Sequence, residues 1–230
     1  MRIHGLQKMT LLDYPGKVAC TVFLGGCDLC CPYCHNAGLL DASAPAQLDG
    51  EGLLAFLRTR RGLLDGVCIT GGEPLLRPDL NILLREIKDL DFLVKLDTNG
   101  THPDGLKRLV ERGLVDYVAM DVKNAPARYT QTVGVSMDIE AVGQSVAFLL
   151  SGAVDYEFRT TVVAEFHDAE AFGQIGLWLA GAKRYFLQSF EDRGTVLRPG
   201  LHPCPAGQLA HFANIVRPYV PAVELRGVAT

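Results

Sequence analysis

The chain lacks any hydrophobic run long enough to cross a bilayer. Its most apolar stretches, such as residues 142–154, are broken by glycine and polar residues and fall short of the roughly 20 residues that a spanning helix needs. Residues 1–17 carry charged side chains and no apolar segment, so we expect no signal peptide. The chain also lacks a run of Lys or Arg, and its formal net charge is −4. Neither nucleic acid nor a membrane is therefore indicated as a partner.

The composition is that of an ordinary globular protein, with 48% hydrophobic and 21% charged residues in a chain of 230. A core of normal size needs no disulfides for support. The seven cysteines are odd in number, and four of them fall within residues 27–34. This distribution is typical of a cytosolic metal or redox site and not of a secreted disulfide framework, so we predict a cytoplasmic protein.

Short β-rich segments alternate with longer amphipathic segments along the chain. We predict strands at residues 18–24, 66–70, 92–97, 117–122, 156–163 and 184–188, with a short last strand at 222–225. We predict helices at residues 48–60, 79–90, 103–112, 139–151, 169–180 and 206–219. Such alternation indicates right-handed βαβ units and a parallel sheet. We expect one domain over residues 1–230, a partial (β/α)6 barrel of parallel strands, with a doubly wound sheet as the alternative.

The unusual residues all follow predicted strands. The cysteine-rich segment 27–34 follows the first strand, residues 70–74 the second, 96–100 the third and 121–123 the fourth. In both candidate folds, ligands gather at the carboxyl ends of the strands. These segments should therefore meet at one rim, and this convergence carries more weight than any motif alone.

Cys27, Cys31 and Cys34 form a Cys-x-x-x-Cys-x-x-Cys pattern on a loop that contains Gly and Pro. Three thiolates so close in sequence make poor disulfide partners and a suitable cradle for a [4Fe-4S] cluster, in which one iron then keeps an open position for a ligand. One alternative is a zinc knot with His35 as the fourth ligand, and another is a set of free thiols.

The four other cysteines receive no ligand role. Cys30 should point away from the cluster, Cys20 and Cys68 lie within predicted strands as small buried hydrophobes, and Cys204 has no cysteine near it in sequence.

Gly71, Gly72 and Glu73 form the second candidate element. Two glycines let a backbone approach a ligand closely, and the carboxylate can accept hydrogen bonds from an ammonium group. The alternative is a strand-to-helix turn with a carboxylate at the helix start. Asp97 and Thr98 form the third element, where the carboxylate could bind a cation or position a cofactor, or could belong to an Asx turn.

Asp121 and Lys123 lie two residues apart on one strand and so face the same side. The carboxylate can take ribose hydroxyls and the ammonium a ligand carboxylate, whereas the alternative is a surface ion pair. Arg159 and Gln188, on the fifth and sixth strands, are weaker candidates. We predict surface positions without a role for the histidines outside the cysteine segment, which are His4, His102, His167, His202 and His211.

Together these segments resemble the radical S-adenosylmethionine superfamily, and within it the activating enzymes of glycyl-radical enzymes. The resemblance is carried by residues 12–17 (Leu-Asp-Tyr-Pro-Gly-Lys), 27–36, 70–74, 97–100 and 121–123, in order over most of the chain. Its closest form is the activator of anaerobic ribonucleoside-triphosphate reductase. The chain departs from the activase pattern at the end of the sixth strand, where Gln188 stands in place of a histidine.

The resemblance implies a cluster whose fourth iron chelates the amino and carboxylate groups of S-adenosylmethionine. One electron then cleaves the sulfonium and yields methionine and a 5′-deoxyadenosyl radical. It also implies that Tyr33 lies near the adenine, that residues 71–73 hold the amino end of the cofactor, and that His35 belongs to the cofactor-binding segment.

The function implied is an oxidoreductase that generates a glycyl radical on a partner enzyme. The partner would be the large subunit of an anaerobic ribonucleotide reductase, with an electron donor such as flavodoxin. Two alternatives stay open: a radical enzyme that acts on a small molecule or a peptide, and a zinc-stabilised binding module without catalysis.

Overall fold

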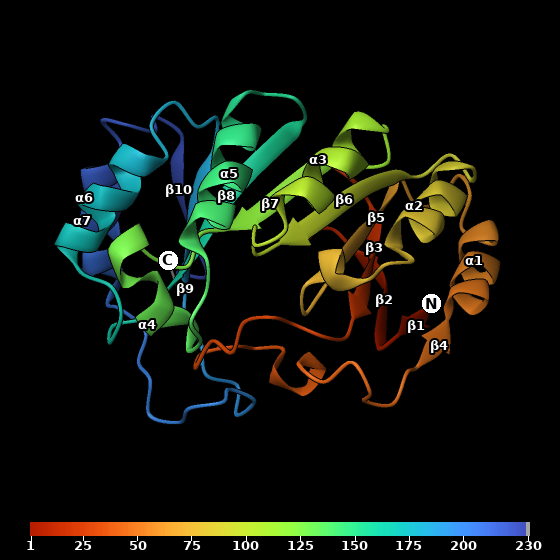
Figure 1. Ribbon diagram of the computed structural model, residues 1–230, viewed down its shortest axis with the longest axis horizontal. Helices are drawn as coiled ribbons and strands as arrows, with labels where there is room; N and C mark the ends of the chain where they lie inside the picture. The colour runs from red at the N-terminus through yellow and green to blue at the C-terminus, as the bar shows by residue number, and fades with distance from the viewer. Residues whose placement is uncertain (229–230) are drawn as a thin grey trace.

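An eight-stranded sheet occupies the centre of the computed structural model, which describes residues 1–228 (Figure 1). The strand order is β10-β9-β8-β7-β6-β5-β3-β2, and every neighbouring pair from β3 to β10 is parallel, whereas β2 pairs antiparallel with β3. Because β2 and β10 each have one neighbour, the sheet is not closed. This arrangement confirms the predicted partial barrel with parallel strands.

The strands of this sheet are β2 (Gly5–Thr10), β3 (Ala19–Leu24), β5 (Gly66–Gly71), β6 (Leu93–Thr98), β7 (Tyr117–Asp121), β8 (Asp155–Val162), β9 (Tyr185–Ser189) and β10 (Val223–Arg226). A separate two-stranded sheet joins β1 (Arg2–Ile3) to β4 (Leu48–Asp49). It ties the start of the chain to the segment before the first helix.

Helices lie between successive parallel strands and surround the outside of the curved sheet (Figure 1). They are α1 (Gly50–Arg58), α2 (Leu80–Lys88), α3 (Pro103–Glu111), α4 (Tyr129–Val133), α5 (Ile139–Leu150), α6 (Ala169–Trp178) and α7 (Ala206–Val216). Among residues 1–228, none of the helices has both the length and the apolar character that crossing a membrane requires.

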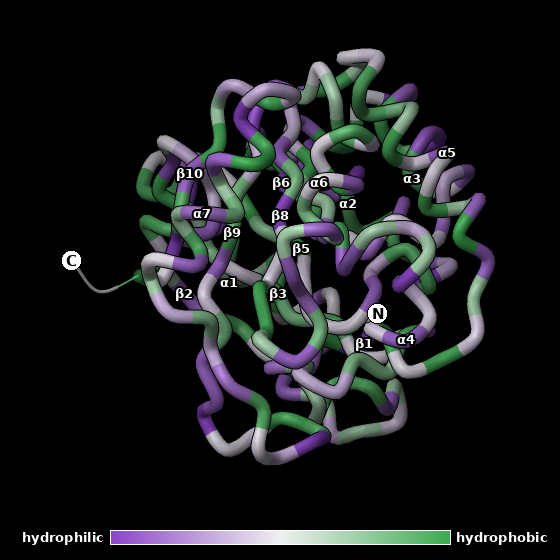
Figure 2. The backbone as a smooth tube through the Cα atoms, turned by 90° about the vertical axis from the view of Figure 1, so that its left-hand side faces the viewer, coloured by the Kyte–Doolittle hydropathy of each residue, from purple (hydrophilic) through white to green (hydrophobic). Residues whose placement is uncertain are grey.

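Local sequence explains where the main helices begin and which face they bury. Asp49, Asp138 and Asp168 cap α1, α5 and α6, since each carboxylate accepts a backbone N–H of the first turn. In α2, the buried residues Leu80, Leu83, Leu84 and Ile87 recur at helical spacing, so one apolar stripe faces the sheet. Figure 2 shows this alternation of polar and apolar residues along the outer helices, such as α3 and α5.

The predicted order of strands and helices is confirmed from β3 to β10, and the bounds closely follow the predicted ranges. The largest difference is α7, which ends at Val216 where the prediction ran to residue 219. Three strands and one helix were not predicted: β1, β2, β4 and α4. The edge strand β2 carries Gln7, Lys8 and Met9 exposed to solvent, so it shows none of the apolar continuity that marks the buried strands.

Candidate active site

Cys27, Cys31 and Cys34 lie on one loop, directly after β3, and all three line a cavity of about 380 Å³. The cavity lies at the carboxyl ends of the strands, where the chain leaves β5, β6, β7 and β9. The predicted convergence of motifs on one rim is therefore what the structure shows. The lining includes all but one of the predicted site residues: Cys27, Cys31, Tyr33, Cys34, His35, Gly71, Gly72, Asp97, Thr98, Asp121, Lys123, Arg159 and Gln188.

Burial makes the three loop cysteines weak acids when no metal is bound. It raises the pKa of Cys27 to about 12 and that of Cys31 to about 11, and it also raises the pKa of Cys34. Thiolates are the form that binds metal, so uptake of a metal group must release these protons. The backbone N–H of Leu29 donates to Cys27 Sγ at 3.4 Å, which would stabilise a thiolate there.

The other cysteines stand apart from this cavity, and all seven are free. Cys30 is exposed and does not line the cavity, as predicted, while Cys20 and Cys68 are fully buried within β3 and β5. Cys204 is also buried. The donor set at the cavity is thus three sulfur atoms from one loop.

His35 does not suit the role of a fourth zinc ligand. Its Nε2 lies 2.8 Å from the carbonyl oxygen of Glu191, and its ring stacks on Phe190 with a centroid separation of 5.7 Å. Within residues 1–228, no three or more His, Cys, Asp or Glu side chains gather closely enough to hold one metal ion. A four-iron cluster spaces its cysteine ligands around a cube and needs no such tight gathering.

Gly71 and Gly72 bring two backbone segments into close contact beside the cavity. Gly71 has φ +121°, and a Cβ at Gly72 would lie 2.1 Å from the carbonyl oxygen of Gly26. The Gly72 N–H donates to Leu24 O at 2.8 Å, and Asn36 Nδ2 donates to Gly71 O at 3.0 Å. The glycines therefore seat the cysteine loop directly against the end of β5.

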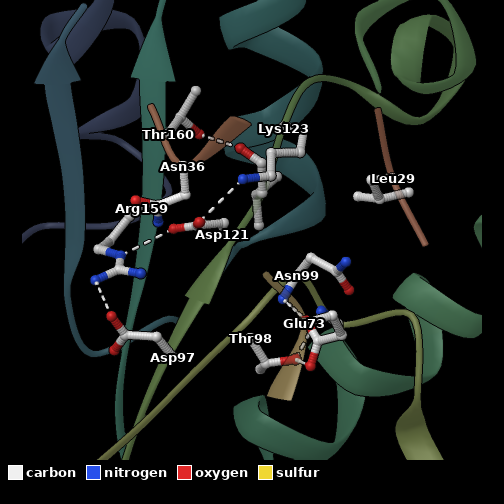
Figure 3. Close-up of polar contacts among 12 residues, drawn as sticks. Leu29, Asn36, Glu73, Asp97, Thr98, Asn99, Asp121, Lys123, Arg159 and Thr160 are labelled. Atoms are coloured by element: carbon white, nitrogen blue, oxygen red, sulfur yellow. Dashed lines mark hydrogen bonds and ion pairs between the residues drawn. The ribbon is translucent and has the colours of Figure 1, made fainter. Parts of the chain in front are cut away.

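Glu73 corrects the prediction that its carboxylate faces a ligand in this cavity. The side chain is completely buried and accepts hydrogen bonds from the Thr98 hydroxyl at 2.9 Å and the Asn99 N–H at 2.7 Å (Figure 3). It also caps the short helix η2 (Pro74–Leu76) through Leu75 N at 3.0 Å. Burial raises the pKa of Glu73 to about 7, although these donors oppose the shift. The alternative reading, a carboxylate in a turn, describes its contacts better.

A row of alternating charges crosses the floor of the cavity from β6 to β8 (Figure 3). Arg159 Nη1 lies 3.3 Å from Asp97 Oδ2, Arg159 Nε lies 2.9 Å from Asp121 Oδ1, and Lys123 Nζ lies 2.9 Å from Asp121 Oδ2. The buried Lys95 pairs with the other oxygen of Asp97. Asp97 thus already holds two protein cations.

These partners decide the protonation states in the row. Burial would raise the pKa of Asp97 and Asp121, but Arg159 and the adjacent lysine outweigh it and hold both pKa values below the usual range. Asp121 raises the pKa of both Arg159 and Lys123 despite their burial, and Asp97 adds to the effect on Arg159. The row therefore presents fixed, alternating charges to a bound ligand near neutral pH.

Tyr33 is a buried side chain that lines the cavity. Its hydroxyl has no hydrogen-bond partner among the described residues, and its ring packs against Phe166 at a centroid distance of 5.8 Å. Since buried hydroxyls are normally bonded, a ligand in the cavity is a natural partner.

His167 corrects the prediction of a surface position. It is buried, its Nδ1 meets the backbone of Val163 at 3.1 Å, and its Nε2 lies 2.9 Å from Lys123 O. Burial lowers the pKa of His167. It therefore supports the backbone at the end of β7.

Several lining residues had no role in the sequence prediction: Asp13, Leu29, Asn36, Leu40, Thr70, Asn99 and Thr161. All of them except Leu40 and Thr161 belong to segments that the resemblance marked, so their place in a motif was the available signal. Asp13 accepts a hydrogen bond from the Thr21 hydroxyl at 2.5 Å, which ties the segment before β3 to the inner face of the sheet.

Residues 21–169 match the model of the radical SAM superfamily. The chain belongs to that superfamily. Its members use a [4Fe-4S] cluster and S-adenosylmethionine, and the three-cysteine loop with a neighbouring cavity is the place in this chain that suits both groups.

Relatives extend this likeness over the whole chain. A Methanocaldococcus jannaschii protein assigned as a glycyl-radical enzyme activating enzyme is 30% identical over 98% of this chain and 96% of its own length. The pyruvate formate-lyase-activating enzyme of Clostridium pasteurianum is 33% identical over 54% of this chain and 52% of its own. The chain is thus homologous to enzymes of the activating branch.

A solved structure supports the fold. Streptococcus suis SuiB bound to S-adenosylmethionine matches with a TM-score of 0.69, covering 90% of this chain and 52% of that one, at 13% identity. At this low sequence identity, the match supports only the likeness in fold.

Proposed function

We propose that Cys27, Cys31 and Cys34 hold three irons of a [4Fe-4S] cluster and that S-adenosylmethionine binds in the adjoining cavity. The carrying observation is that, among residues 1–228, these three thiols and no other cysteine line the cavity where the strand-end motifs converge. The fit extends to the unbonded hydroxyl of Tyr33 and to the N–H of Leu29 at Cys27 Sγ. When bound, the cluster would supply one electron to the sulfonium, giving methionine and a radical that removes hydrogen from a substrate.

The chain's own residues would bind and orient the cofactor. Lys123 and Arg159 are cations that can take its carboxylate, and Asp121 between them can accept the ribose hydroxyls. The backbone at Gly71 and Gly72 can approach the amino end because no side chain intervenes. Tyr33 faces the adenine in this assignment.

We further propose that the substrate is a glycine of a partner protein, so that the chain is an activase of a glycyl-radical enzyme. The relative assigned to this activity is homologous over 98% of the chain, which supports the proposal. The chain offers no second group of cysteines, a feature of a minimal activator. The sheet is not closed between the edge strands β2 and β10, and in this proposal a loop of the partner approaches the cavity from that side.

The finer assignment is to anaerobic ribonucleoside-triphosphate reductase, with its large subunit as partner, a donor such as flavodoxin as electron source, and a cytoplasmic setting. It rests on the motif of residues 12–17 and on the Tyr-Cys-His-Asn sequence of residues 33–36. Both are features of the sequence.

The test is radical transfer under anaerobic conditions. Reconstituted protein is mixed with S-adenosylmethionine, a low-potential reductant and a candidate reductase subunit, and the partner is examined by electron paramagnetic resonance. A glycyl radical signal that disappears with Cys31→Ser, and persists with Cys30→Ser, supports the proposal.

Other outcomes decide between the alternatives. Cofactor cleavage without any glycyl radical would favour the second candidate, an enzyme that acts on a small molecule or peptide. A colourless protein with one zinc and no iron would overturn the cluster assignment and favour a zinc-stabilised module.

A further inference from the structure

Asn99, which follows β6, points its side-chain amide at the first cysteine of the loop. Its Nδ2 lies 3.9 Å from Cys27 Sγ and 2.9 Å from Asp28 Oδ1. Asn99 itself is only 6% exposed, so its amide is shielded from water that could compete for these contacts. A buried N–H therefore faces the sulfur atom that we assign to one iron.

The direction of this amide is fixed by its neighbours. Asn99 Oδ1 accepts the Thr101 backbone N–H at 3.0 Å, so the NH₂ group must lie on the side of Cys27. The Asn99 backbone N–H donates to Glu73 Oε2 at 2.7 Å (Figure 3). Glu73 thus acts as a positioning residue that holds Asn99 against the cysteine loop.

Asp28 places a negative charge near the same sulfur, and this charge acts against the effect of the Asn99 amide. Its Oδ1 lies 4.0 Å from Cys27 Sγ, and its Oδ2 accepts the Thr101 hydroxyl at 2.6 Å and lies 3.2 Å from His102 Nε2. The amide of Asn99 lies in contact with both the carboxylate and the sulfur. Cys27 is therefore the ligand position where a neutral donor and an anion act together.

Hydrogen bonds to cluster sulfurs and nearby charge are two of the factors that set the reduction potential of an iron–sulfur cluster. An N–H donor stabilises the reduced cluster, which carries one more negative charge, whereas a carboxylate destabilises it. We propose that Asn99 raises the reduction potential of the cluster through Cys27 and that Asp28 lowers it. The inference rests on the cluster assignment made under the proposed function.

The experiment is a redox titration of the reconstituted protein with mediators, in which the reduced cluster is counted by its paramagnetic signal. It needs no S-adenosylmethionine and no partner. Asn99→Asp replaces the donor with an acceptor of the same shape and adds a charge. At the midpoint potential of the wild type, we expect about a tenfold lower ratio of reduced to oxidised cluster, equivalent to a shift of about 59 mV for one electron.

Two further variants separate this effect from general damage. Asn99→Ala removes the donor without adding charge and should lower the ratio several-fold, while Asp28→Asn should raise it. Asn81→Asp, on α2 and outside the cavity lining, adds the same charge at a distance and should leave the potential unchanged. Iron content and thermal melting of each variant show that the cluster and the fold are intact.

The inference is overturned if Asn99→Asp and Asn81→Asp have the same midpoint potential, or if Asp28→Asn shifts the midpoint potential in the same direction as Asn99→Asp. Should Asn99→Asp fail to take up iron, Asn99→Ala and Asp28→Asn decide the matter by the opposite signs of their shifts. A wild-type protein that binds no iron would instead overturn the cluster assignment, and the two failures are thus distinct.

Discussion

Arg159 is the residue whose removal should disturb the charged row most. Its guanidinium contacts both Asp97 and Asp121, and its side chain is 14% exposed. Removing one partner of a buried ion pair costs about 3–5 kcal/mol, because the remaining charge is left uncompensated. Asp97 keeps Lys95 and Asp121 keeps Lys123, so for Arg159→Met we expect the lower end, about 3 kcal/mol.

Arg128→Met provides a matched control on the surface. Arg128 also contacts two carboxylates, those of Asp168 and Glu170, but these partners are 54% and 69% exposed. Exposed pairs contribute about 0–1 kcal/mol, so this variant should lie close to the wild type. Urea denaturation of the metal-free protein under anaerobic conditions measures both variants. A drop in melting temperature of roughly 6–12 °C should accompany the loss in Arg159→Met.

The pH dependence of the unfolding free energy tests whether the lost ion pairs cause the destabilisation of Arg159→Met. In the wild type the pKa values of Asp97 and Asp121 are lowered, so their stabilisation is present above the unfolded value of about 4 and is lost as pH falls through the folded values. Arg159→Met removes most of this term, so the difference in unfolding free energy between wild type and variant should stay nearly constant from pH 7 to about pH 5 and narrow as the pH falls below about 4. An equal loss in both arginine variants at pH 7, or a gap that does not change with pH, would refute the reasoning.

Two further predictions concern the glycine turn and the end of β7. Gly72→Ala places a Cβ 2.1 Å from Gly26 O and should lower the free energy of unfolding by about 1–3 kcal/mol. Gly143→Ala, in α5 with nothing within 4 Å of the new atom, should raise it by about 0.5–1 kcal/mol. Urea denaturation that ranks the two variants in the opposite order would contradict this packing. Asp121→Asn should weaken S-adenosylmethionine binding to the reconstituted protein by about tenfold in equilibrium dialysis, since a charged hydrogen bond of this kind is worth about 1.5 kcal/mol. The exposed Asp155→Asn should bind like the wild type, and equal affinities of all three proteins would remove Asp121 from the binding site.

Much of the fold could be predicted because its strands are buried and its helices have one apolar face. β7, for example, is a run of buried residues that ends in Asp121, and α2 repeats leucine at helical spacing. β2 escaped prediction because an edge strand exposed on one side has no such signal. α4 escaped because a helix of five residues shows too little periodicity.

The rim could be predicted because parallel strands bring their carboxyl ends together. What the sequence could not show is which way each side chain turns there. Glu73 points into the fold because the N–H groups of Asn99 and Leu75 lie within reach, and their positions depend on how η2 packs on β6. Arg159 bridges Asp97 and Asp121 only because β6, β7 and β8 pair in one particular register.

The wrong prediction for His167 has the same origin. A histidine between a strand and a helix is usually exposed, but here its ring bonds with the backbone at Val163 and Lys123, two segments distant from one another in sequence. Side-chain contacts with a distant backbone leave no local trace in composition or periodicity.

The most direct measurement of the central claim is cofactor cleavage by anaerobically reconstituted protein, with iron counted in the same sample. The account predicts about four irons per chain and formation of 5′-deoxyadenosine and methionine from S-adenosylmethionine once low-potential electrons are supplied. Both should be lost in Cys27→Ser, Cys31→Ser and Cys34→Ser and kept in Cys204→Ser. Iron-loaded wild-type protein that leaves the sulfonium intact under these conditions would contradict the account.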